Sequence, residues 1–186
     1  MPLWDWLFGG KDPSADWVAD PAVAHVLDLD RPSLCGIALG DSADEIARLG
    51  PPENRHATRD EQYSYDKHGF TIDVDERAVS GFIIFFVEVK GLRCTPFSGE
   101  AVHAGQTFTL SAETREGEWR ERFGEPYWRD ADKGEILLFY ELGDVEWQVE
   151  FDRTGHLRVL NIVTPPMFND ARQRAAYGVD KPWPPR

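Results

Sequence analysis

The sequence LGDSADEIARLGPPENR, residues 39–55, contains a short predicted helix with residue types that start and stop helices at its two ends. Ser42 and Glu45 form a capping-box pattern, in which the Ser42 hydroxyl accepts from the Glu45 backbone N–H and the Glu45 carboxylate accepts from that of Ser42. Gly50 can adopt the left-handed conformation that ends a helix, and the two prolines that follow prevent its continuation. The stretch therefore predicts a very short helix with defined ends.

A second stretch, LSAETREGEWRERFGEPYWR at residues 110–129, has the same order of features. Ser111 or Thr114 can begin a helix there, and Gly124-Glu125-Pro126 ends it. The two closing glycines are separated by 124 − 50 = 74 residues. We therefore expect one supersecondary unit to be used twice.

Alternation of apolar and polar residues predicts antiparallel strands around each helix. In the first unit the expected strands are 37–39, 61–66, 70–75 and 79–89. In the second unit they are 108–110, 135–142, 145–151 and 156–163. Aligning the strands that begin at Phe70 and Val145 gives an offset of 145 − 70 = 75 residues, close to the offset between the helices. The order of elements predicts an α+β fold in which helices pack on one face of an antiparallel sheet.

The rest of the chain is predicted to extend and connect these repeats. Asp20 as N-cap and Pro21 at the first helical position predict a helix of about two turns in the segment AVAHVLDL, residues 22–29. We expect one compact domain whose parts are an N-terminal extension with one helix (1–35), repeat 1 (36–90), a connector (91–106), repeat 2 (107–164), and a short helix with a proline-rich tail (165–186).

The net charge of −13 over 186 residues disfavours partners that carry phosphate. Nucleic acid and anionic membrane surfaces would be repelled before contact, whereas a basic protein or a cation is allowed. Simple solubility is an equally open interpretation of this charge. The chain has no apolar stretch long enough to span a bilayer, so no transmembrane segment is expected.

The N-terminal stretch MPLWDWLFGGKDPS, residues 1–14, lacks the basic region of a signal peptide and the cysteine of a lipoprotein leader. We therefore expect a cytoplasmic protein whose aromatic start packs on its own fold. Cys35 and Cys94 have no paired spacing, which favours reduced thiols and leaves a single disulfide open.

The order of a strand, a short capped helix ending in Gly-x-Pro and a meander, repeated after 74 to 75 residues, resembles the tandem-repeat fold of bacterial β-lactamase inhibitor proteins. One copy also resembles the small outer-membrane assembly lipoproteins. The pattern of that second family corresponds here to Gly40, Ser42, Asp44, Glu45, Leu49, Gly50 and Pro52.

The resemblance covers residues 36–163 and implies one continuous antiparallel sheet used for binding a protein, not for catalysis. The chain departs from both families in two respects. It has no secretion signal or lipid-anchor cysteine, and it lacks the paired cysteines of the inhibitor's repeats. The inhibitor's target and its mode of stabilisation are therefore not carried over.

No residue pattern indicates a catalytic centre, a cofactor or a metal site, and none is expected. No glycine-rich loop opens a helix after a strand, and no serine or cysteine has the sequence context of a nucleophile. The histidines stand alone without ligand spacing: His25, His56, His68, His103 and His156.

The alternating strands place acidic residues on one side of the predicted sheet. The candidate binding residues are the carboxylates Asp73, Asp75, Glu146 and Glu150, with Tyr63, Tyr65, Tyr127 and Trp128 around them. Aromatic side chains beside charge are common in protein-binding surfaces. The ordinary polar outer side of a half-buried sheet is the competing interpretation, and a divalent-cation site made of the same carboxylates is a weaker one.

The leading hypothesis is a non-enzymatic protein-binding module, such as an inhibitor or an immunity-type protein that binds a basic toxin through this acidic and aromatic face. An alternative is an enzyme or small-molecule-binding protein on a cone-shaped, cystatin-like α+β fold, with His103 or Tyr140 lining the cavity. A structural accessory domain is a third possibility.

Overall fold

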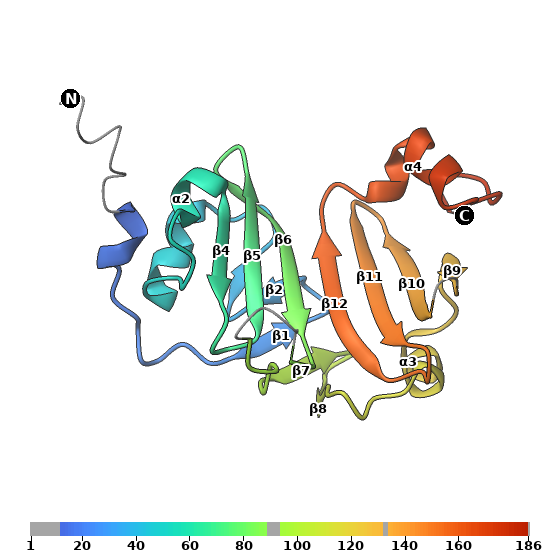
Figure 1. Cartoon of the computed structure of the whole chain (residues 1–186), viewed down its shortest axis with the longest axis horizontal. Helices are drawn as coiled ribbons and strands as arrows, with labels where there is room; N and C mark the ends of the chain where they lie inside the picture. The colour runs from blue at the N-terminus through green and yellow to red at the C-terminus, as the bar shows by residue number, and fades with distance from the viewer. Residues whose placement is uncertain (1–11, 89–93, 132–133, 186) are drawn as a thin grey trace.

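The structure is a computed structural model that describes residues 12–88, 94–131 and 134–185. The expected packing of the aromatic N-terminal start falls largely outside these residues. Most of the described chain is built around two β-sheets with short helices at their margins (Figure 1). The α+β class predicted from the sequence is confirmed.

The larger sheet has seven strands in the order β4-β5-β6-β12-β11-β10-β9, and every neighbouring pair is antiparallel. Its strands are β4 (Gln62–Tyr65), β5 (Phe70–Asp75), β6 (Ala78–Phe85), β9 (Trp128–Asp130), β10 (Glu135–Leu142), β11 (Val145–Asp152) and β12 (Leu157–Val163). All but β9 lie at positions predicted from alternation. The two meanders therefore join through β6 and β12 into one sheet (Figure 1).

The smaller sheet has five strands in the order β3-β2-β1-β7-β8. Its strands are β1 (Val26–Asp28), β2 (Ser33–Leu34), β3 (Ile37–Ala38), β7 (Glu100–His103) and β8 (Gln106–Thr109). Only β3 and β8 correspond to predicted strands. The segment 91–106, predicted as a plain connector, therefore contributes β7 and the start of β8 to a sheet.

The helix predicted for residues 22–29 is wrong, because the end of this segment forms β1. The Asp20 carboxylate accepts from the Ala22 backbone N–H at 2.9 Å, but it caps a turn, not a helix. Val26–Asp28 then pairs in parallel with Glu100–Val102. This long-range pairing, which the local sequence does not show, outweighs the helix signal at Asp20-Pro21.

The helices are short and differ from prediction mainly at their starts. They are the 3₁₀ helices η1 (Pro13–Asp16), η2 (Ala43–Leu49) and η3 (Met167–Asn169), and the α-helices α2 (Ala57–Asp60), α3 (Glu116–Phe123) and α4 (Ala171–Ala176). Before η2, the Ser42 hydroxyl accepts from the Asp44 N–H at 3.3 Å, and not from Glu45 as the capping box requires. Before α3, the Arg115 backbone N–H donates to the Glu118 carboxylate at 3.0 Å, one residue beyond the expected Thr114.

The inner face of the seven-stranded sheet packs with the smaller sheet, η2 and α3 into one hydrophobic core. In this core Ile46 of η2 and Trp119 of α3 are buried. The opposite face, turned toward the viewer in Figure 1, is called the outer face below. Helix α4 lies at one end of the C-terminal strands, so the helices are not all on one side of the sheet as predicted (Figure 1).

Three local features occur at corresponding places in the two halves. First, Cys35-Gly36 and Ala104-Gly105 both have positive φ at two consecutive residues, +55° and +72° in one turn and +51° and +71° in the other. This is the backbone of a type I′ hairpin turn, and it joins β2 to β3 and β7 to β8.

The second and third features belong to the ends of η2 and α3. Gly50 and Gly124 end these helices with the same φ of +82°. The Tyr65 hydroxyl donates to the Gly50 carbonyl at 3.1 Å, and the Tyr140 hydroxyl donates to the Gly124 carbonyl at 2.9 Å. Corresponding tyrosines on β4 and β10 thus satisfy corresponding glycine carbonyls.

The strand register relates the halves as well. Ile72 faces Phe82 in the first meander, and Trp147 faces Ile162 in the second. Across the junction of β6 and β12, Phe82 faces Ile162. The two meanders therefore meet at a pair of residues that hold the same position in each.

Both cysteines, Cys35 and Cys94, are buried and free. This agrees with the expectation of reduced thiols, and the open alternative of a disulfide between them is not realised. Desolvation raises the pKa of the Cys35 thiol to about 12, so this thiol is not a nucleophile near neutral pH.

Candidate functional site

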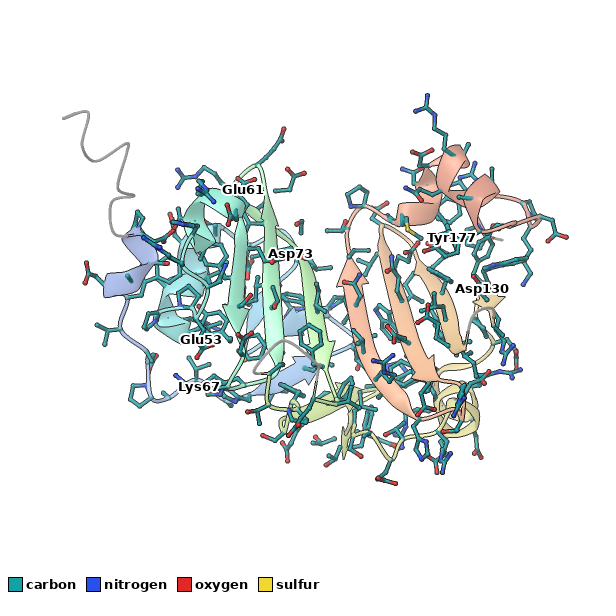
Figure 2. The ribbon with its side chains drawn as sticks, in the orientation of Figure 1. Glu53, Glu61, Lys67, Asp73, Asp130 and Tyr177 are labelled. Atoms are coloured by element: carbon teal, nitrogen blue, oxygen red, sulfur yellow. The ribbon has the colours of Figure 1, made fainter. Side chains whose placement is uncertain are left out.

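The outer face of the seven-stranded sheet carries the predicted carboxylates, but only part of that prediction fits the structure. Asp75 is exposed at the end of β5. Asp73 is half-buried and accepts from the Gln62 side-chain amide at 2.9 Å, and desolvation raises its pKa. In the view of Figure 2, Asp73 lies over the N-terminal strands of this face.

Glu146 is wrong as a binding residue because its side chain is 0% exposed. Its carboxylate accepts from the Phe168 backbone N–H at 3.1 Å, so the segment of η3 covers it. Glu141 lies directly opposite on β10. Burial, and secondarily the hydrogen bond and repulsion with Glu146, raise the pKa of Glu141 well above its ordinary value. This pair belongs to the attachment of the C-terminal segment, not to an accessible site.

Glu150 is half-buried and is neutralised by its neighbour. Its carboxylate lies 2.6 Å from an Arg158 guanidinium nitrogen, and the two form an ion pair across β11 and β12. Desolvation raises the pKa of Glu150 despite this ion pair. The predicted field of four free carboxylates is thus reduced to the Asp73 and Asp75 edge of the outer face.

Tyr63 and Tyr65 do not border the outer face, and their prediction as binding residues is wrong. Both side chains point to the inner face, where they are 4% and 2% exposed. Tyr63 stacks on Trp17 with ring centroids 5.5 Å apart. The alternation of Gln62, Tyr63, Ser64 and Tyr65 places both tyrosines with Ile72 and Phe70, on the apolar side of the sheet.

Tyr127 and Trp128 are also wrong as parts of an open rim. The Tyr127 hydroxyl lies 3.2 Å from the Lys181 and Pro182 carbonyls, and its ring packs against Trp183. Trp128 on β9 faces Phe139 of β10. Both residues lie beside the C-terminal segment, whose Tyr177 is placed near the top of β10 in Figure 2.

The centre of the outer face holds an apolar surface that sequence reasoning missed. Phe85 faces Val159 across β6 and β12, and Val163 faces Gly81 further along the same pair. Ile83 lies between them on β6, opposite Asn161. We call Ile83, Phe85, Val159 and Val163 the central outer patch; each of these side chains is half-buried. The run GFIIFF at residues 81–86, apolar on both sides of a strand, is the signal that could have revealed it.

A hollow of about 330 Å³ lies on the inner side of the C-terminal half. His103 and Tyr140, the residues named for a cavity in the alternative prediction, both line it. His103 Nδ1 lies 2.9 Å from an Asp30 carboxylate oxygen in a close but poorly aligned contact. The same carboxylate accepts from the Ala104 N–H at 3.0 Å, and the backbone bond to Ala104 is the first cause of the lowered pKa of Asp30.

The chemistry available in this hollow is that of binding. The residues lining it are Leu29, Asp30, Pro32, His103, Phe123, Tyr140, Leu142, Val145 and Trp147. They include no serine, threonine or cysteine nucleophile, and the Tyr140 hydroxyl is held by Gly124. Among residues 12–88, 94–131 and 134–185, no three His, Cys, Asp or Glu side chains group in a way that could hold a metal ion.

Comparison with known proteins gives little beyond the fold. No protein-family model matches the chain, and no curated protein matches it. Among solved structures, the chain is similar to a DUF4309 family protein, YjgB, from Bacillus subtilis, with 14% identity, a TM-score of 0.47, and coverage of 70% of this chain and 84% of that one. Within the described part of the chain, no helix has the length and apolar character needed to cross a bilayer.

Proposed function

We propose that this protein is a non-enzymatic binding module that engages a basic protein partner through the outer face of its seven-stranded sheet. The observation that carries the proposal is the central outer patch, an apolar surface at the middle of the face with carboxylates at its edge. Protein interfaces commonly have an apolar centre and a polar rim. Asp73 and Asp75 supply the acidic part of that rim on β5.

Two further considerations support a protein partner. The seven-stranded sheet extends over both halves without a break, and in Figure 1 no helix lies across β5, β6 and β12 on the outer side. The net charge of −13 favours a basic partner by long-range attraction. An inhibitor or immunity-type role in the bacterial cytoplasm, on a fold made of two tandem repeats, is the specific form of the proposal.

The experiment begins with a photo-crosslinking amino acid at Phe85 in cells of the source organism, with the same amino acid at Val18 as control. Val18 is apolar and 82% exposed, so it matches the chemistry of the patch but lies before β1, away from the outer face. The protein captured from position 85 and not from position 18 is then purified, and its Kd for the wild-type chain is measured by calorimetry.

Phe85→Ala is expected to weaken that Kd by at least ten-fold, because a buried aromatic side chain at the centre of an interface commonly contributes about 2 kcal/mol. Val18→Ala should leave the Kd unchanged. Raising the salt concentration should weaken binding, since part of the attraction is between charges. Equal Kd values for Phe85→Ala, Val18→Ala and the wild type would contradict the proposal.

A further inference from the structure

The hollow on the inner side of the C-terminal half contains a hydrogen-bond donor without a partner. Trp147 lies at its wall with a side chain that is 3% exposed, and the indole Nε1 has no acceptor among the described residues. A buried N–H without an acceptor costs free energy, and native proteins rarely keep one. Trp147 therefore has room beside it and an unmet need for an acceptor.

The corresponding place in the N-terminal half is closed. The type I′ turns relate His103 to Leu34, and the strand offset relates Trp147 to Ile72. Leu34 and Ile72 are both 0% exposed and pack in the hydrophobic core. The same frame therefore takes two aliphatic side chains in one half and two amphipathic side chains beside a hollow in the other.

Folding alone does not account for this difference. A cavity costs about 20 to 30 cal/mol for each Å³ in a core, and an unpaired donor adds to that cost. The N-terminal half shows that the frame accepts aliphatic residues at these positions. A hollow kept at the expense of stability is the usual property of a binding site.

We propose that the hollow binds a small, neutral, mostly apolar molecule that carries one carbonyl acceptor, held by a hydrogen bond from Trp147 Nε1. Its volume of about 330 Å³ is at the lower end of the usual range for small-molecule sites, roughly 300–1,000 Å³. The six residues that define the site are Leu29, Asp30, His103, Phe123, Tyr140 and Trp147.

The lining determines the class of ligand. Leu29 and the ring of Phe123 offer apolar contact, and Phe123 packs edge-on against Trp147 with centroids 5.6 Å apart. The Asp30 carboxylate at the rim disfavours an anion, as does the charge of the whole chain. Water alone would leave most of its hydrogen bonds unmet against this apolar wall. The site lies on the opposite side of the sheet from the central outer patch, so it stands independently of the protein-binding proposal.

The test uses two probes that differ only in the acceptor, acetophenone and ethylbenzene. Each is titrated into the full-length ¹⁵N-labelled protein while the indole N–H resonances are followed by NMR. The peak absent from Trp147→Phe identifies Trp147, and Trp17→Phe is the matched control at a tryptophan outside the hollow. The Trp147 peak is expected to shift with acetophenone, which should bind at least about five-fold more tightly than ethylbenzene, since one hydrogen bond is gained.

Two variants complete the design. Trp147→Phe keeps the ring but removes the donor, so acetophenone should lose its advantage over ethylbenzene. Val145→Phe introduces the residue that the N-terminal half has at Phe70, and it should fill the hollow and abolish binding of both probes. Circular dichroism checks that each variant is folded, and the comparison of the two probes on Trp147→Phe remains decisive if Val145→Phe does not fold.

The proposal is overturned by any of three results. One is equal binding of acetophenone and ethylbenzene to the wild type, and another is no shift of the Trp147 peak up to the solubility limit of acetophenone. The third is unchanged binding of acetophenone to folded Val145→Phe.

Discussion

The two halves of this protein share a frame but use it differently. In each half a type I′ turn, a glycine at φ +82° and a tyrosine hydroxyl bonded to that glycine occur in the same order. The N-terminal half fills its inner side with aliphatic residues such as Leu34 and Ile72. The C-terminal half places His103 and Trp147 there and keeps a hollow. The difference separates what the frame needs for folding from what one half has beyond that need.

The largest effect is expected where the halves meet. Phe82 is 0% exposed and faces Ile162 across the junction of β6 and β12. Phe82→Ala should lower the free energy of unfolding by about 3–5 kcal/mol, because it leaves a cavity in a shared core. Urea denaturation followed by both fluorescence and circular dichroism checks this. Two separate transitions in the wild type would show that the halves fold independently and would contradict the shared core.

A smaller and symmetrical effect is expected at the two tyrosines. Tyr65→Phe and Tyr140→Phe each remove a hydroxyl that satisfies a glycine carbonyl, at Gly50 and Gly124 respectively. Each change should cost about 1–2 kcal/mol, and the two costs should agree within about 0.5 kcal/mol. The measurement is the same urea denaturation. If only one of the tyrosines matters, the correspondence of the two helix ends is a coincidence of geometry.

A further difference between the halves is the carboxyl pair under the C-terminal segment. The folded-state pKa of Glu141 is raised by burial and by Glu146, so the folded state binds a proton that the unfolded chain releases above its ordinary pKa of 4.5. The stabilisation from this proton is complete below pH 4.5 and is lost as the pH rises toward the raised folded-state pKa.

Glu141→Gln removes the need for the proton and should therefore melt at a higher temperature than the wild type at pH 8. The difference should shrink as the pH is lowered toward 4.5. The exposed Glu113→Gln is a suitable control and should show no such dependence. Parallel pH profiles of melting temperature for Glu141→Gln and the wild type would show that Glu141 carries no shared proton.

Local sequence patterns predict the strands well and their surroundings poorly. Alternation over 70–75 and 145–151 identifies β5 and β11 and the faces of their side chains. It does not show that Phe168 donates to Glu146 and buries it, because that contact joins residues 22 positions apart in the chain. The same limit explains β1, which depends on a parallel partner, β7, from a distant segment.

Some of the candidate site was nevertheless within reach of the sequence. Ser64 between Tyr63 and Tyr65 puts both tyrosines on the inner face, so their assignment to the outer rim was avoidable. His103 and Tyr140 were named for a cavity, and they do line one. The pairing of His103 with Asp30 was not predictable, because it depends on how two separate turns approach each other.

The most direct test of the difference between the halves is to exchange one residue between corresponding places. Leu34→His puts a polar ring into the closed half and should lower the free energy of unfolding at pH 8 by about 2–4 kcal/mol, since no acceptor or space awaits it. His103→Leu places the residue of the closed half in the hollow and should change the free energy of unfolding by less than about 1 kcal/mol, or raise it. Equal losses of stability in the two variants, measured by urea denaturation, would show that His103 is as much a part of the core as Leu34 and would contradict the account.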